Sequence, residues 1–477
     1  MIISFLVVIA LSMVLAMRAR AGHSQQSAKD FFVAHGQFGA VLLFFLSVGE
    51  TYSVLTMLGF PGGVYSGGQD FIIWFFGFIM MAPTLLFFIG PWIWRAGRLY
   101  GAATIADFFG RHFESRSLEI FVAISCIILL IPIGTMQFVG IRLVLTHLMP
   151  GVVPALLTSL AAAVTLAYVL LAGLRASAFV AVLKDLLMLA AIVVVGVAAL
   201  FLSQNGGANL PPASEILHAT GGGESGDGAA LAISTIILQA IGFLVIPQGW
   251  AVLFSARSAD SIRQTQMVAP LYMVMFPMLV IVAQYARTHG IVPGRPDFVF
   301  LAVTEALLPS YLTGVIFATV TLAGLVILSG VCLAIAPLIT RNMVPNLSNN
   351  RQMIWAKVVT GIYLVASVIC AETSTRLMAT INGLFHMGIT QLFPGLLAAL
   401  FWARVPAKAV IAGVLIGFFT VGGLMTSWSG ASYFNVGILA LVANLVGLWV
   451  VSHVSPRASS AQSVIRKVAC NQNAARG

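Results

Sequence analysis

The chain has 477 residues, of which 60% are hydrophobic and only 8% are charged, and its mean hydropathy is +1.02. This composition excludes a soluble globular protein and indicates a polytopic membrane protein. A net charge of +10 would suggest nucleic-acid binding in a soluble chain, but here the basic residues gather between apolar runs. We therefore expect the lipid bilayer as a partner, and no nucleic acid.

Thirteen apolar runs are long enough to cross a bilayer, and we expect them to pack as one all-α domain over residues 1–477. The runs fall at 1–17, 38–60, 69–92, 117–146, 150–172, 178–203, 229–254, 267–290, 311–338, 353–371, 376–402, 407–427 and 432–452. We interpret the first run as a membrane helix, with a cleaved signal peptide as the alternative, because Arg18 and Arg20 follow it and no charge precedes it.

The loop charges predict the topology. Of the 24 lysines and arginines, 20 fall in alternate connections, all on one side of the predicted bundle. Under the positive-inside rule this side is the cytoplasm. An odd number of spans then places the N-terminus outside and the tail, 453–477, in the cytoplasm. The predicted location is a bacterial-type inner (plasma) membrane.

The second run is interrupted by polar residues. Its middle holds Gly49, Glu50, Thr51 and Ser53. A charged group near the centre of a span costs about 2.5–3.5 kcal/mol on insertion scales, so it usually faces a cavity or a partner. Glycine weakens a helix, and irregular backbone at membrane depth persists only where protein or water covers it. We predict a broken helix that builds a solute site; the alternative is a polar contact between packed helices.

A second break is predicted in the seventh run, where residues 242–249 read GFLVIPQG and Pro247 removes a helical hydrogen bond. Gln248 and Trp250 lie beside this break, and Gln137 lies in the span 117–146. We expect these three side chains to contact the solute. An interhelical hydrogen bond is the alternative for Gln137, and packing is the alternative for Trp250.

Other polar residues within or beside the runs have a local interpretation. Lys184 and Asp185 stand next to each other at the expected cytoplasmic end of the run 178–203, where we predict a local ion pair. His386 is either a proton or substrate group, or a hydrogen-bonded core histidine.

Several stretches, in one order along the chain, resemble the sodium:solute symporter family of proline, pantothenate, sugar and monocarboxylate permeases. They are Leu58–Tyr65, Ala106–Phe113, Gly140–Leu143, Ala181–Asp185, Pro247–Ser258 and Gln391–Trp402. The resemblance implies a LeuT-like fold with an inverted five-plus-five helix repeat core. The first repeat would cover 38–203 and the second 229–402. An extra helix, 1–17, would precede them and two helices, 407–452, would follow. Such repeats place the solute and ion sites at the bilayer midplane, beside the interrupted helices.

The same resemblance assigns residues to the sites. It implies that the backbone carbonyls of Gly49 and Tyr52 bind a coupling ion, while Thr51 and Ser53 match site positions of relatives. Sodium-coupled members also supply two hydroxyls from the span 311–338, where this chain has Val326 and Ile327. Sodium requires oxygen ligands, so we expect a degenerate sodium site.

We predict that transport is sodium-independent and either proton-coupled, with Glu50 carrying the proton in place of sodium, or passive. The alternative is that Glu50 only caps or pairs within the bundle, and that waters complete a weakened sodium site. Apart from Na+ or H+ as the coupling ion, no cofactor is expected.

The sequence thus predicts a secondary active transporter of a small organic solute, a monocarboxylate or an amino acid, working by alternating access. It is not predicted to be an enzyme, and no Walker-type motif supports ATP-driven transport. The stretch 247–258, PQGWAVLFSARS, is most similar to monocarboxylate permeases. The alternatives are a membrane solute sensor that acts through a separate signalling partner, and a channel. No required protein partner is inferred for the transporter.

Overall fold

The structure, a computed structural model, describes residues 1–21, 38–205, 227–344, 347–427, 433–455, 463–465 and 467. All regular elements in these ranges are helices, which satisfy their backbone groups internally as a bilayer requires. The first half forms α1 (Ile2–Ala21), α3 (Ala40–Thr51), the π-helical η2 (Leu55–Gly59), α4 (Phe60–Tyr100), α5 (Ile105–His112), α6 (Arg116–Leu148) and α7 (Pro154–Asn205). The second half forms α9 (Asp227–Gly242), α10 (Pro247–Ser255), α11 (Ala259–Val268), η3 (Ala269–Val274), α12 (Met275–Thr288), η4 (Pro296–Phe298), α13 (Val299–Leu307), α14 (Ser310–Thr340), α15 (Asn349–Thr373), α16 (Met378–Ile389), η5 (Thr390–Leu392), α17 (Phe393–Phe401), α18 (Ala407–Ser427) and α19 (Val436–Val454).

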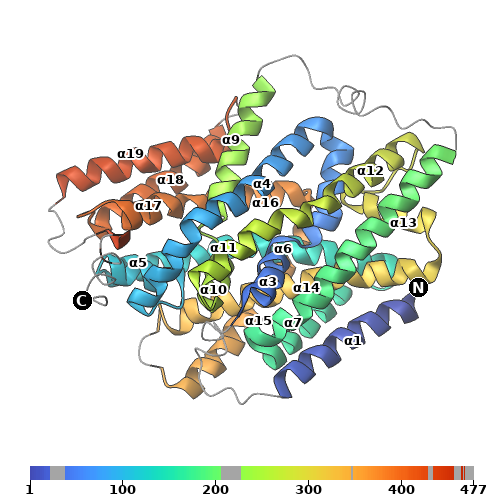
Figure 1. Ribbon diagram of the computed structural model, residues 1–477, viewed down its shortest axis with the longest axis horizontal. Coiled ribbons are helices and arrows are strands. Elements are labelled where there is room, and N and C mark those ends of the chain that lie inside the picture. The colour runs from blue at the N-terminus through green and yellow to red at the C-terminus, as the bar shows by residue number, and fades with distance from the viewer. Residues whose placement is uncertain are drawn as a thin grey trace.

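The helices pack around α14, which is buried along almost its whole length. Figure 1 shows α1 at one edge of the bundle and the pair α18 and α19 at the opposite edge, with the short helices α3 and α10 near the middle. Both short helices contact each other and α14, and α7 packs against α3 and α14. The two helices that the sequence predicts to be broken are therefore neighbours inside the bundle.

The number of spans is only partly accounted for. Among the described residues, nine helices are long and apolar enough to cross a membrane, or ten if the bent pair Gly228–Gly242 and Pro247–Ser255 is one span. The predicted number of thirteen is not confirmed. Three further predicted runs coincide with apolar helices of 10–17 residues, which are Ile2–Arg18, Ala40–Thr51 and Pro154–Val169. The second of these is short because the helix is broken, as predicted.

Helix α4 differs from the prediction at its start. The sequence predicts a connection between the runs 38–60 and 69–92, whereas α4 begins at Phe60 and continues to Tyr100. The change of direction is concentrated at Gly68, whose φ of 61° and ψ of −138° are not helical. Only glycine adopts this conformation without strain, so the chain changes direction at this single residue instead of in a loop.

Aromatic side chains join the first third of α4 to α12. Phe60 and Phe75 lie 4.9 and 5.7 Å from Phe276, measured between ring centroids, and Phe71 packs on both Phe60 and Phe75. Tilted and edge-to-face contacts of this kind add to the free energy gained by burying the rings. They make this end of the bundle a dense apolar wall.

Candidate functional site

A cavity lies between the two broken helices. Its empty space, with open solvent at its mouth included, is about 1030 Å³. Its polar lining comes from α3 and the residues after it, from α6, α10, α11 and α16: Ser47, Glu50, Thr51, Ser53, Thr56, Gln137, Gln248, Thr265, Gln266, Asn382 and His386. Five of the six predicted solute-binding residues therefore meet at one cavity, and Trp250 is the exception.

The first break lies directly after Gly49–Thr51, the three residues at which the sequence predicts the helix to be interrupted. Helix α3 ends at Thr51, and Tyr52 is extended, with φ −98° and ψ 114°. The Ser53 hydroxyl accepts a hydrogen bond from the backbone N–H of Leu55 at 3.1 Å, which starts the next helical segment. The Thr51 hydroxyl donates to the Ser47 carbonyl at 2.8 Å, so it stays within its own helix. Glu50 remains helical.

Lys184 of α7 reaches into this break. Its Nζ donates to the carbonyl of Tyr52 at 2.8 Å and to that of Gly49 at 3.1 Å. The predicted ion pair with Asp185 is present, with 2.5 Å between Nζ and Oδ1, but both side chains are fully buried rather than at the end of a span. This role of Lys184 was not predicted, because the residue was counted among the loop charges. A lysine inside an apolar run was the signal.

Two contacts bring α7 close enough for this arrangement. A Cβ atom on Gly49 would lie 2.9 Å from the Cβ of Ala181, so only glycine allows the helices to approach so closely. Behind the break, the Tyr272 hydroxyl donates to the Asp185 carbonyl at 2.5 Å, and the Tyr52 ring stacks on Tyr272 with centroids 5.1 Å apart. The backbone of the break is thus held on both sides.

Glu50 projects toward α14. A side chain at Gly330 would overlap its carboxylate, so glycine leaves the room that the carboxyl occupies. The Oε2 atom of Glu50 is buried and has no hydrogen-bond partner among the described residues. The sequence predicts a degenerate sodium site from two residues of α14. Ile327 lines the cavity together with Glu50, and Val326 packs in an apolar cluster with Ala181 of α7.

The second break lies where the sequence predicts it. Helix α9 ends at Gly242, α10 begins at Pro247, and the two are bent by 50°. Gln248 is 5% exposed, lines the cavity, and its Oε1 has no partner among the described residues. Trp250 is fully buried, and its indole N–H donates to the Leu244 carbonyl at 2.8 Å. This position fits the packing alternative for Trp250.

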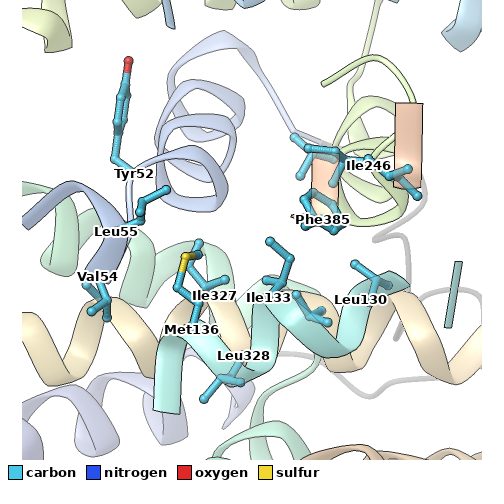
Figure 2. Close-up of a cluster of buried hydrophobic side chains, with 14 of the residues drawn as sticks. Tyr52, Val54, Leu55, Leu130, Ile133, Met136, Ile246, Ile327, Leu328 and Phe385 are labelled. Atoms are coloured by element: carbon cyan, nitrogen blue, oxygen red, sulfur yellow. The ribbon is translucent and has the colours of Figure 1, made fainter. Parts of the chain in front are cut away.

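The floor of the cavity is mainly apolar. Figure 2 shows Ile133 and Met136 on α6, with Leu55 after the first break on one side and Ile246 and Phe385 by the second break on the other. Gln137 of α6 also lines the cavity, and it is fully buried. Neither its Nε2 nor its Oε1 has a partner among the described residues. The interhelical hydrogen bond considered for Gln137 therefore has no counterpart there.

His386 combines both of its interpretations. Its Nδ1 lies 3.0 Å from the carbonyl of Asn382, as in a core histidine. Its Nε2 has no partner within the described part of the chain, and the ring lines the cavity. A buried polar atom without a partner costs about 1–3 kcal/mol, so atoms of this kind on Gln137, Gln248 and His386 indicate a binding surface for water or a solute.

Two broken helices that meet at a buried, partly polar cavity inside a helical membrane bundle define the architecture of a secondary transporter. The sequence matches the sodium:solute symporter family over residues 31–417, and the chain belongs to this family.

Relatives in bacteria support this assignment. The chain is 26% identical to an uncharacterized symporter, YhjB, of Bacillus subtilis, over 95% of this chain and 97% of the relative. It is also 26% identical to a monocarboxylate transport permease protein of Rhizobium johnstonii, over 95% and 96% of the two chains.

Solved structures show the same fold. A Na+-coupled sialic acid symporter, solved in a substrate-bound outward-open state, aligns with a TM-score of 0.77 at 16% identity over 96% of this chain and 98% of its own. A nucleobase-cation-symport-1 family transporter, solved closed with bromovinylhydantoin bound, aligns with a TM-score of 0.56 at 14% identity, covering 90% and 96%. At these identities the likeness concerns the fold alone.

Proposed function

We propose that this chain is a permease that carries a small monocarboxylate across the membrane by alternating access at the cavity between the two breaks. The observation that carries the proposal is a set of buried polar atoms on Gln137, Gln248 and His386 that have no partner among the described residues and that face one cavity from three helices. These are groups that a polar solute would satisfy, and the apolar lining suits a short hydrocarbon chain.

The charge of the solute is argued from helix α10. Its first residues, Pro247 and Gln248, begin at the break, and both Gln248 and Gly249 line the cavity. The free N–H groups and the partial positive charge at a helix N-terminus favour an anionic group. The name of the Rhizobium relative points to the same solute class. The names of the relatives give no support to the sensor alternative.

The proposed frame for the movement is the pair of five-helix repeats, 38–203 and 229–402, with the predicted orientation. In that orientation, Leu43 near the start of α3, Leu253 near the end of α10, and Ile262 and Thr265 near the start of α11 face the cytoplasm, and all line the cavity. The aromatic wall around Phe60 and Phe276 then closes the outer side. We infer an inward-facing conformation, which transport would exchange for an outward-facing one.

Uptake into proteoliposomes tests the solute. We expect saturable accumulation of labelled pyruvate or lactate, inhibited by other short monocarboxylates and not by proline or sialic acid. Uptake of an amino acid without uptake of any monocarboxylate would contradict the proposed solute class.

A further inference from the structure

The feature that the proposed function leaves unused is the buried lysine at the first break. We propose that the Lys184 ammonium is a built-in cation that occupies the place of a coupling sodium ion, so that the first break neither needs nor binds sodium. The consequence for uptake rests on the proposed transport function, whereas the consequence for ion binding does not.

The ammonium group of Lys184 is surrounded by oxygen atoms of the break and of Asp185. Two of its protons go to the carbonyl oxygens of Gly49 and Tyr52, and the Asp185 carboxylate lies 2.5 Å from the same nitrogen. These two carbonyls are the ones that the family resemblance assigns to the ion. A lysine ammonium has three donors and no acceptor. Here two donors are hydrogen-bonded to carbonyls and the charge is paired with the Asp185 carboxylate, whose oxygens have no hydrogen-bond partner among the described residues.

The buried positive charge of Lys184 is balanced by a buried negative charge. The Lys184 and Asp185 side chains are both 0% exposed, and a buried cation is tolerated when it is paired and hydrogen-bonded. Asp185 is therefore already matched by a positive charge that the chain itself provides. A sodium ion on the same carbonyls would stand within a few ångströms of a like charge in a medium that screens poorly.

The α14 side of the first break is apolar at the two positions predicted to form the degenerate sodium site. Sodium needs oxygen ligands, but Val326 is buried in an apolar cluster with Ala181 and Tyr168, and Ile327 presents a hydrocarbon side chain to the cavity. These two α14 side chains therefore offer sodium no ligand, whereas the two carbonyls of the break already bind an ammonium group tethered to α7.

The arrangement also has a mechanical meaning. The lysine joins α7 to the point where α3 unwinds, and Gly49 sets the close approach of the two helices. A free ion holds two elements together only while it is bound. A tethered ammonium holds them in every transport cycle, and its contacts with the two carbonyls are made and broken only by movement of the helices.

The first test measures ion binding by the purified wild-type protein in detergent. Its thermal midpoint is compared in sodium chloride and in choline chloride of equal ionic strength. We expect no sodium-specific shift, because the site is already filled. A rise of the midpoint with sodium that saturates would overturn the proposal, whether or not any solute has been found to be transported.

The second test uses uptake. We expect wild-type monocarboxylate uptake to be unchanged when choline replaces sodium. Uptake by the Lys184→Ala variant should be lower than that of wild type by a factor of about ten or more, as expected when a buried ion pair loses one member. Added methylammonium, which supplies the missing ammonium group, should restore part of it. Lys408→Ala, which removes an exposed lysine, is the matched control and should behave as wild type.

The outcomes separate the two proposals. Wild-type uptake that collapses in choline overturns the tethered cation, as does full uptake by Lys184→Ala in both salts. If wild type transports no monocarboxylate in either salt, the proposed solute fails, and the sodium-dependent thermal midpoint still decides the role of Lys184. If Lys184→Ala does not fold, the two wild-type measurements remain decisive.

Discussion

The two breaks of this transporter solve one problem in different ways. Unwinding a helix in a membrane frees backbone carbonyls, which must find donors inside the protein. At the first break the donor is the ammonium group of Lys184, which comes from α7, 132 residues away from Tyr52. At the second break the donor for Leu244 is the indole of Trp250, six residues further along the same segment.

The two breaks should therefore respond differently to helix movement. A neutral donor from the same segment would let the second break move as a unit, with its hydrogen bond intact. A charged donor from another helix makes the first break sensitive to how α3 and α7 are placed. We therefore expect changes at the first break to disturb both stability and transport, and changes at Trp250 to disturb mainly stability.

The largest effect is expected for Lys184→Met, which keeps the length of the side chain but removes its charge. Asp185 is left as a buried charge without its partner, which typically costs about 3–5 kcal/mol. The thermal midpoint of the purified variant should fall well below that of wild type. Adding Asp185→Asn should recover part of the loss, because it removes the unpaired charge. A double variant less stable than Lys184→Met would show that the pair is not what matters.

At the second break, Trp250→Phe keeps most of the ring but removes the indole N–H. The Leu244 carbonyl loses its donor, at a cost of about 1–3 kcal/mol. We expect a lower thermal midpoint, with uptake per folded molecule close to that of wild type. If uptake instead falls while the midpoint stays unchanged, Trp250 contacts the solute after all, and the contrast between the two breaks is lost.

A pair of cavity variants compares the polar groups beside each break. Gln248→Ala removes a side chain with an unpartnered atom, so we expect uptake to fall by about 5- to 150-fold, which corresponds to about 1–3 kcal/mol. Thr51→Val should have a smaller effect, because the Thr51 hydroxyl is already bonded to the Ser47 carbonyl. Membrane insertion of both variants, checked by their yield in the membrane fraction, should be normal. Equal losses would place Thr51 in direct contact with the solute.

The smallest effect concerns a group away from both breaks, on α5 between two predicted spans. Burial lowers the pKa of His112 to about 4, and the nearby Lys467 acts in the same direction. Because the unfolded chain binds this proton near pH 6.5 and the folded chain does not, the stabilising contribution is complete above pH 6.5 and is lost as the pH falls toward 4. The thermal midpoint should decline in this range, and less steeply in His112→Phe. This slope is the background against which any pH effect at the breaks is measured.

The sequence predicts those features of the site that are caused by residues close by in the chain, and it fails for those caused by distant residues. Pro247 breaks its own helix, and the second break lies where it was predicted. Gln137 and Gln248 were found because an amide stands out in an apolar span. The end of α3, however, is set by a partner far along the chain. Lys184 contacts the carbonyls of Gly49 and Tyr52 only in three dimensions, and no local pattern contains that contact.

The same reasoning explains two displaced predictions. The predicted apolar run begins at residue 178, so Lys184, near its start, was counted with the basic residues of the preceding loop. In the structure, α7 continues from Pro154 to Asn205, and Lys184 lies inside it. Tryptophan has an apolar ring and a polar N–H, so its sequence position beside a break fits both a residue that lines the cavity and a buried residue that donates a hydrogen bond to the backbone. Whether Glu50 carries a proton stays a prediction.

Gly330 gives the protein a point at which selectivity for charge can be altered by a single methyl group. Its missing side chain is the recess in α14 into which the Glu50 carboxyl folds. An alanine there would place a methyl group in overlap with the Oε1 atom of Glu50, so the carboxyl would have to leave the recess and extend further into the cavity that it already lines. Because a carboxylate repels anions, we expect such a change to disfavour acids relative to neutral or cationic cargo.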